Sequence, residues 1–194
     1  MIFISTISEI KMLIGISGKF AVGKDELCSH ILNYLEKHGR KSSHLKFADP
    51  LKKACAIIGG TRLEDNYSIE GKEKMVEGLG MSIGRMQQVV GTILREHLHP
   101  DVWVLPVIQF YKNNPDTICV VSDCRFKNEA NLIKKFGGVL IRLNREKRPV
   151  ISGRDPNHIS ETDLDDYEGF DLIIDNNGTI QEMVDTVFSF LKFV

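Results

Sequence analysis

The chain has 194 residues and a formal net charge of −1, from 25 basic and 26 acidic side chains. This length fits one well-cored domain with insertions. The balanced charge disfavours a nucleic-acid partner, and no apolar stretch approaches the roughly 20 residues that cross a bilayer. Because the N-terminus also lacks a cationic segment followed by a long apolar one, we expect a soluble, cytoplasmic protein without a membrane partner. The four cysteines lack metal-type spacing and are expected to be buried free thiols.

The first predicted elements are a strand, a glycine-rich loop and a helix. Residues 12–17 form a short apolar run that is typical of a buried strand, and apolar residues recur every four positions from residue 27. Between these elements, residues 18–25 read Gly-Lys-Phe-Ala-Val-Gly-Lys-Asp, which is the spacing of a phosphate-binding P-loop. Residues 1–11 precede this unit and are expected to be an optional extension.

The P-loop interpretation has a direct physical basis. Gly18 and Gly23 let the backbone curl so that successive N–H groups point at a polyphosphate, and the helix N-terminus adds positive potential. Lys24 is placed to reach the β- and γ-phosphates of a nucleotide. Asp25 stands where Ser or Thr normally binds Mg²⁺, so Asp25 either acts on the metal through water or only caps the helix.

The later elements continue as alternating strands and helices. Strands are predicted at residues 43–47, 117–122, 139–143 and 171–175, and helices near residues 49–58, 86–95, 128–136 and 180–191. A further helix from Asp101 should kink at Pro106. Residues 62–80 are polar and contain glycine, which predicts a mobile segment. Five strands alternating with helices indicate an α/β fold with a mostly parallel, doubly wound sheet.

Two long connections interrupt this alternation. Residues 59–116 are too long for a simple crossover and predict a helical substrate-binding insertion into a core of residues 12–58 and 117–194, within one domain. Residues 144–165 predict a small basic lid, with the arginines Arg145, Arg148 and Arg154. Since ligands of α/β sheets lie at the carboxyl ends of strands, both connections are expected to overhang the P-loop. This is the plan of a phosphotransferase for a small substrate.

Several motifs resemble those of one known family, the deoxynucleoside monophosphate kinases of phages and large DNA viruses. The motifs follow the family's order at residues 18–25, 47–51, 91–95, 101–103, 122–129 and 158–161. The resemblance implies a three-layer P-loop kinase fold and transfer of the γ-phosphate of ATP, with Mg²⁺, to a deoxynucleoside monophosphate. Such a reaction supplies DNA precursors, and the resemblance also allows a homodimer.

Three other functions stay open at this point. Animal phosphomevalonate kinases share the Gly-Lys-Asp loop and the Ala48-Asp-Pro-Leu51 segment. A P-loop NTPase switch would instead need a water-positioning residue and a hydrolysis rate that is independent of any acceptor. A non-catalytic nucleotide-binding scaffold would need neither Lys24 nor a basic lid, and the chain has both.

Donor binding is assigned to the P-loop and to the turn after the last strand. The candidate ATP-binding residues are Gly18, Lys19, Ala21, Val22, Gly23, Lys24, Asp25, Asn177 and Gly178. Lys19 either assists the phosphates or serves only solubility, and the Asn177-Gly178 pair either contacts adenine or forms only a turn. Asp123 ends a central strand as a Walker B carboxylate would, so Asp25 and Asp123 are the candidate metal residues, acting through water. A helix cap or an ion pair with Arg125 is the alternative for Asp123.

Acceptor binding and transition-state charge are assigned mainly to arginines, because guanidinium groups bind phosphates in a planar fork. The candidate acceptor-binding residues are Phe47, Asp49, Arg85, Gln88, Arg95, Trp103, Arg125 and Glu161. The candidate catalytic residues are Lys24, Arg95, Asp123, Arg145 and Arg148. Arg85 also fits a solvated helix face, and Trp103 either stacks on a base or packs in the core. A hydrogen-bonded pair of His158 and Glu161 is expected to hold the lid.

Overall fold

The computed structural model describes residues 12–147 and 159–193. It divides the chain into two compact units. The first unit combines the chain up to residue 45 with the chain from residue 110 onwards, and the second spans residues 46–109. The glycine-rich loop and the strand ends around it all belong to the first unit.

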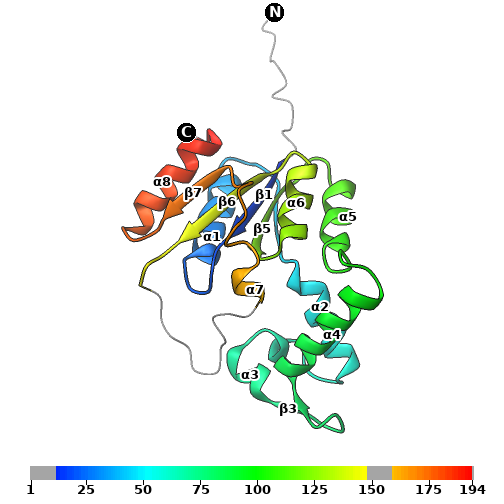
Figure 1. Cartoon of the computed structure of the whole chain (residues 1–194). Coiled ribbons are helices and arrows are strands. Elements are labelled where there is room, and N and C mark those ends of the chain that lie inside the picture. The colour runs from blue at the N-terminus through cyan, green and yellow to red at the C-terminus, as the bar shows by residue number, and fades with distance from the viewer. Residues whose placement is uncertain (1–11, 148–158, 194) are drawn as a thin grey trace, which may run out of the picture. The chain divides into compact units, whose positions relative to one another are not determined.

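The first unit is a sheet covered by helices (Figure 1). Its elements are β1 (Leu13–Ser17), α1 (Lys24–Lys37), β2 (Ser42–Leu45), β5 (Ile118–Cys124), α6 (Lys127–Lys135), β6 (Val139–Asn144), α7 (Ile159–Thr162), β7 (Leu172–Asp175) and α8 (Ile180–Leu191). Helix α5 (Leu105–Asn113) continues from the second unit into the first. The five expected strands all form, within about two residues of the predicted bounds.

The sheet has the strand order β2-β5-β1-β6-β7, and each of its four strand pairings is parallel. This confirms the predicted α/β fold with a five-stranded parallel sheet. Strand β1 is central, with β5 on one side and β6 on the other. The carboxyl ends of these three strands therefore meet at one edge of the sheet, which is where ligands of such folds bind.

Alternation along β1 assigns its two faces to different helices. Ile14 and Ile16 are fully buried in a core cluster with residues of α1 and α8, including Leu27, Ile31 and Val187. The intervening Gly15 faces α6, because a Cβ at this position would lie 2.4 Å from Cδ1 of Ile133. Helices therefore cover both faces of the sheet, which gives the three expected layers (Figure 1).

The second unit is mainly helical. Its elements are α2 (Ala48–Ile58), the 3₁₀ helix η1 (Glu64–Asn66), α3 (Ile69–Glu73), β3 (Met75–Val76), β4 (Met81–Ser82) and α4 (Ile83–His97). The unit begins before residue 59, where the sequence analysis placed the insertion, because α2 packs against α4. Leu51 of α2 packs on a small core formed by Cys55, Val76, Ile83 and Met86.

The structure adds detail to two local expectations in this unit. Residues 62–80 contain η1, α3 and an antiparallel β3–β4 pair, and Asn66 is fully buried with its side-chain amide bonded to Thr61 and Gln87. The mobility expected for this segment stays a prediction. The helix near Asp101 begins only at Leu105, after a turn. Pro106 then lies in the first helical turn, where its missing N–H costs nothing, so it does not kink the helix.

All four cysteines are buried and free, as the sequence analysis predicted. Burial raises the pKa of the Cys55 thiol to about 11. Burial also holds the pKa of the Cys124 thiol well above its usual value. Both thiols are therefore protonated near neutral pH, and neither has the thiolate character of a nucleophile.

Helix α8 begins with a capping box, and its loss should be measurable. Thr179 Oγ1 accepts the Glu182 N–H at 3.2 Å, and Glu182 Oε2 accepts the Thr179 N–H at 2.7 Å. The Thr179 N–H lowers the pKa of the Glu182 carboxyl, so this half of the cap is present at neutral pH and is lost as pH falls through that pKa.

We expect Thr179→Ala to lower the free energy of unfolding by about 1 kcal/mol in urea titrations at neutral pH. Thr186→Ala on the same helix is the matched control, because the Thr186 hydroxyl donates to the carbonyl of Glu182, one turn earlier in the helix, and caps no helix end. Equal stability of the two variants would contradict a capping role for Thr179.

Candidate functional site

The glycine-rich loop joins β1 to α1 at the ligand-binding edge of the sheet. Three of its residues have positive φ angles: Gly18 at 149°, Ala21 at 59° and Gly23 at 101°. This backbone turns the loop into a curl that ends at the first turn of α1, where the N–H groups have no helical partner. The curl and the helix start are the two parts of a phosphate-binding loop that the sequence predicted.

The two glycines are required by close neighbours as well as by their φ angles. A Cβ at Gly18 would lie 2.5 Å from the backbone oxygen of Leu143, and a Cβ at Gly23 would lie 2.7 Å from Nδ2 of Asn176. Asn176 is buried at the end of β7, and its Nδ2 donates to the carbonyl of Val22 at 2.9 Å. The loop is therefore fixed against β6 on one side and against the end of β7 on the other.

Lys24 lies over its own loop. Its Nζ donates to the carbonyls of Gly18 at 2.8 Å and Lys19 at 2.6 Å. Lys24 is buried, with 8% of the residue exposed. The ammonium group is thus held at the mouth of the curl, the position from which a P-loop lysine meets nucleotide phosphates.

Asp25 is connected to two strand ends by a chain of hydrogen bonds. Ser122, buried on β5, donates its hydroxyl to Asp25 Oδ1 at 3.1 Å, and Nε2 of His44 lies 2.7 Å from the same hydroxyl oxygen. Because the Ser122 proton is used toward Asp25, the His44 nitrogen is the donor in its own contact. Asp25 is therefore oriented by Ser122 and His44 as well as by the helix start.

The neighbouring segment after β5 is anchored by a buried glutamate. Glu129 Oε2 accepts the backbone N–H groups of Arg125 at 2.7 Å and Phe126 at 3.1 Å, at the start of α6. Asp123 is the second-last residue of β5, two positions before Arg125, and is partly exposed. Asp123 and Asp25 are thus both attached to the β5 end, one through the chain and the other through Ser122.

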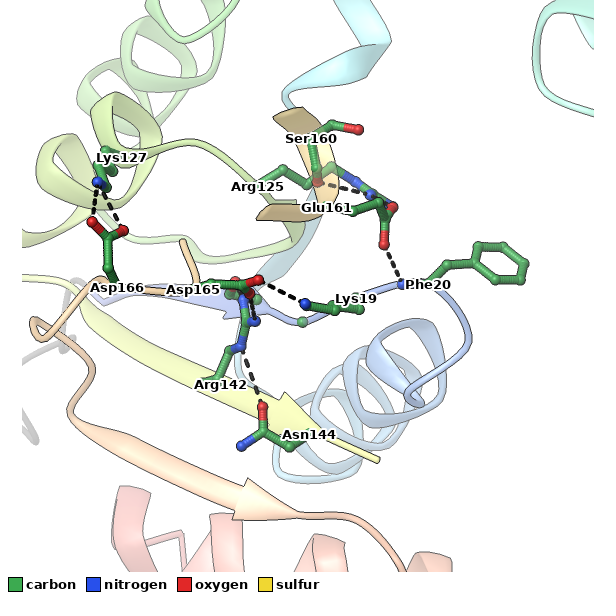
Figure 2. A network of polar contacts seen from close by, with 12 residues as sticks. Lys19, Phe20, Arg125, Lys127, Arg142, Asn144, Ser160, Glu161, Asp165 and Asp166 are labelled. Atoms are coloured by element: carbon green, nitrogen blue, oxygen red, sulfur yellow. Dashed lines mark hydrogen bonds and ion pairs between the residues drawn. The ribbon is translucent and has the colours of Figure 1, made fainter. Parts of the chain in front are cut away.

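Residues 159–166 bring a second set of charges onto the loop (Figure 2). The Arg125 guanidinium forms an ion pair with Glu161 Oε1, and Glu161 Oε2 accepts the Phe20 N–H at 2.8 Å. Asp165 pairs with Lys19 at 2.7 Å and with Arg142 at 3.0 Å. The loop, the β5 end and this segment therefore form one polar network.

Comparisons with known proteins identify the family to which the chain belongs. Residues 68–187 match the sequence family described as deoxynucleotide monophosphate kinase. The chain is also 32% identical over 195 aligned positions to a protein of Acanthamoeba polyphaga mimivirus named as a putative deoxynucleotide monophosphate kinase, covering 92% of this chain and 95% of that protein. The chain belongs to the deoxynucleotide monophosphate kinase family. This confirms the resemblance drawn from the motifs and shows that the protein is a kinase.

Among solved structures, a shikimate kinase from Bacteroides thetaiotaomicron aligns with 93% of this chain and 98% of its own, at 10% identity and a TM-score of 0.40. In the described part of the chain, no helix is long and apolar enough to cross a membrane. The cytoplasmic location expected from the sequence stays a prediction.

The described residues that were predicted to bind the donor each have a definite place in the structure. Val22 is buried, Ala21 has the positive φ of the curl, and Lys19 is paired with Asp165. The Asn177 side chain accepts the Glu146 N–H at 3.0 Å, and Gly178 precedes the capped start of α8. Arg145 is exposed directly after β6. Arg148, Arg154 and His158 lie outside the described residues.

The predicted acceptor-side residues of the second unit have their own contacts within that unit. Asp49 Oδ1 accepts the Tyr67 hydroxyl at 2.9 Å, and Arg85 donates to Gln88 at 3.3 Å. Trp103 is buried, and its indole N–H donates to the Gly91 carbonyl at 3.2 Å. This burial favours the core-packing alternative for Trp103 over base stacking.

Two more residues of the predicted acceptor set are also placed there. Phe47 is buried, and one nitrogen of the Arg95 guanidinium lies 3.5 Å from the Gly91 carbonyl oxygen. The carbonyl oxygen of Gly91 thus accepts hydrogen bonds from the side chains of both Trp103 and Arg95. The acceptor-binding roles of these residues stay predictions.

The sequence analysis did not find several residues that shape the site. Asn176, Asp165 and Ser122 contact the loop or Asp25 directly, and Arg142 bonds Ser17, the residue just before the loop. Asn176 and Ser122 do lie at strand ends, which is a weak signal, since the carboxyl ends of parallel strands meet at the ligand. Arg142 gives a clearer signal, because a charged residue within the apolar run Val139–Asn144 needs a buried partner.

Proposed function

We propose that the protein transfers the γ-phosphoryl group of ATP to a deoxynucleoside monophosphate, giving ADP and a deoxynucleoside diphosphate. The observation that supports this most strongly is the loop of residues 18–25, which has the P-loop curl and a buried lysine at its mouth, in a chain of the deoxynucleotide monophosphate kinase family. In a cell this reaction would supply precursors for DNA.

The loop residues bind and align the donor. Backbone N–H groups at the start of α1 point at the phosphates, and the Lys24 ammonium exchanges its contacts with the Gly18 and Lys19 carbonyls for phosphate oxygens. The acceptor is itself a phosphate, so its oxygen attacks without a general base. Catalysis then depends on alignment, charge neutralisation and exclusion of water.

The residues beside the loop fit Mg²⁺, which prefers oxygen ligands and keeps several of its waters. Asp25 and Asp123 offer carboxylate oxygens at the β5 end, and Asp25 is already oriented by the Ser122 hydroxyl. No group of three or more His, Cys, Asp or Glu in residues 12–147 and 159–193 could hold a metal by itself. When bound, Mg²⁺ neutralises charge on the β- and γ-phosphates, and Asp25 and Asp123 would hold it through water.

Arginines are proposed for the acceptor phosphate and for the charge that develops during transfer. Arg95 on α4 is a partly exposed residue, with Arg85 and Gln88 on the same helix. Arg145, exposed at the end of β6, and Arg148 beyond it supply cations from the segment before α7. Loss of kcat with little change in KM in Arg145→Ala would support its use in the transition state.

The test is ADP release from MgATP in the presence of single deoxynucleoside and ribonucleoside monophosphates and of phosphomevalonate, with Lys24→Ala as the negative control. Turnover with a deoxynucleoside monophosphate that the variant loses supports the proposal and names the substrate. Turnover with phosphomevalonate alone, or ATP hydrolysis that ignores the acceptor, would refute it.

The metal role of Asp25 gives a separate prediction. We expect Asp25→Ala to raise the Mg²⁺ concentration for half-maximal rate by about 10- to 100-fold, the usual effect of losing a group that acts on a metal through water. Glu26→Ala is the matched control, because Glu26 is the next residue of the same helical turn and pairs with His30 at 3.2 Å. An unchanged Mg²⁺ dependence in Asp25→Ala would leave this residue as a helix cap only.

A further inference from the structure

Two carboxylates, one helical turn apart, hold the first half of the glycine-rich loop. Glu161 on α7 accepts the Phe20 N–H, and Asp165 just beyond α7 pairs with the Lys19 ammonium (Figure 2). We call Glu161 and Asp165 the carboxylate clamp. The clamp and the loop are separated by about 140 residues of sequence, since Phe20 and Glu161 are 141 positions apart.

Glu161 is the better buried member of the clamp. The residue is 7% exposed, and both of its carboxylate oxygens are engaged: Oε2 by the Phe20 N–H and Oε1 by the Arg125 guanidinium. Arg125 also donates to the Ser160 carbonyl at 3.3 Å. A carboxylate held on both oxygens by the protein is placed to fix the loop, whereas contact with an acceptor would need a free face.

Two carboxylates beside a polyphosphate site would repel the ligand unless cations neutralise them. Arg125 neutralises Glu161, and Asp165 lies between Lys19 and Arg142. Arg142 is itself buried and also donates to the Ser17 hydroxyl at the end of β1, at 3.2 Å. Three cations therefore face two carboxylates, and the network keeps one net positive charge next to the loop.

The two halves of the loop have different contacts, and the clamp acts on the first half. Lys19 and Phe20 contact the clamp, whereas residues 23–25 form the start of α1, where N–H groups are available to an anion. Between them, Ala21 has a φ of 59°, a conformation that an L-residue adopts only when its surroundings hold it there. Fixing Phe20 on one side and Asn176 against Val22 on the other determines that conformation.

From this geometry we infer that Glu161 is a positioning residue for the phosphoryl donor. It acts through the Phe20 N–H on the shape of the loop and contacts no substrate. The inference rests on the proposed binding of ATP by the loop, and it gives Glu161 a role different from the acceptor contact expected from the motifs. The two roles predict different kinetics, because a positioning residue affects donor affinity and an acceptor residue affects the acceptor KM.

The experiment measures ADP binding by calorimetry, amide exchange of residues 18–25 by mass spectrometry, and the acceptor KM. Glu161→Ala removes both contacts, and Glu161→Gln keeps an oxygen for the Phe20 N–H while it removes the charge that faces Arg125. Asp166→Asn is the matched control, because Asp166 lies in the same segment and pairs with Lys127 at the start of α6 (Figure 2).

We expect Glu161→Ala to weaken ADP binding about tenfold and to speed amide exchange in the loop, because a hydrogen bond to a charged group is lost. Glu161→Gln should fall between Glu161→Ala and the wild type, and it keeps the test valid if Glu161→Ala does not fold. Asp166→Asn should match the wild type in both measurements.

Unchanged ADP affinity and loop exchange in both Glu161 variants, or a raised acceptor KM with unchanged ADP affinity, would overturn the inference. The proposed function fails separately, if the wild type binds ADP but phosphorylates no deoxynucleoside monophosphate. A wild type that does not bind ADP would overturn both.

Discussion

Replacing Lys24 by alanine is expected to lower kcat/KM for phosphoryl transfer by about 10²- to 10³-fold, the usual effect of removing one fixed donor from a transition-state site. The Lys24 side chain reaches across the curl, from the start of α1 to the Gly18 and Lys19 carbonyls. Its charge is therefore held where phosphate charge develops. Steady-state kinetics with MgATP and a deoxynucleoside monophosphate measure the effect.

Lys37→Ala is the matched control for this variant. Lys37 is an exposed lysine in the last turn of the same helix, α1. Lys37→Ala therefore removes the same charge as Lys24→Ala and places an alanine in the same helix. We expect Lys37→Ala to keep the wild-type rate. If Lys24→Ala kept more than a tenth of the wild-type kcat/KM, the loop would not be the donor site.

The P-loop could be predicted from sequence because its determinants are local. Gly18, Gly23 and Lys24 act through backbone conformation and reach within one stretch of eight residues, and the adjoining strand and helix show their periods directly. The strands of the sheet could be predicted for the same reason, because each buried strand appears in the sequence as a short apolar run. The short elements η1, α3, β3 and β4 and the late start of α5 at Leu105 were not predicted, because such short segments show no clear period.

The supports of the loop could not be predicted, because their partners are distant in sequence. Ser122 reaches Asp25 across 97 positions, and Asn176 reaches Val22 across 154. No period or spacing rule links such pairs, and polar residues at strand ends are common. Glu161 was found only through a motif, and its contact with the Phe20 N–H became visible once α7 was placed against the loop. The fold was therefore predictable in more detail than the polar contacts that complete the site.

Gly18→Ala is expected to lower the free energy of unfolding by about 2–5 kcal/mol, because two costs add. The residue has a φ of 149°, and the new Cβ would lie 2.5 Å from the Leu143 backbone oxygen and 2.6 Å from Val22 Cγ2. The backbone oxygen belongs to β6, which is paired with β1 on one side and β7 on the other and cannot move without disturbing the sheet, so the loop must shift instead. ADP binding should weaken together with stability, since the shift displaces the Lys24 contact with the Gly18 carbonyl.

Gly137→Ala separates the two costs. Gly137 also has a positive φ, at 70°, but a Cβ there would meet nothing within 4 Å. We expect this control to lose only about 1 kcal/mol in urea titrations, from backbone strain alone, and to bind ADP as the wild type does. If Gly18→Ala were no less stable than Gly137→Ala, the close approach of the loop to β6 would not be required. If Gly18→Ala lost stability but kept ADP affinity, the curl would serve the fold and the phosphates would be bound elsewhere.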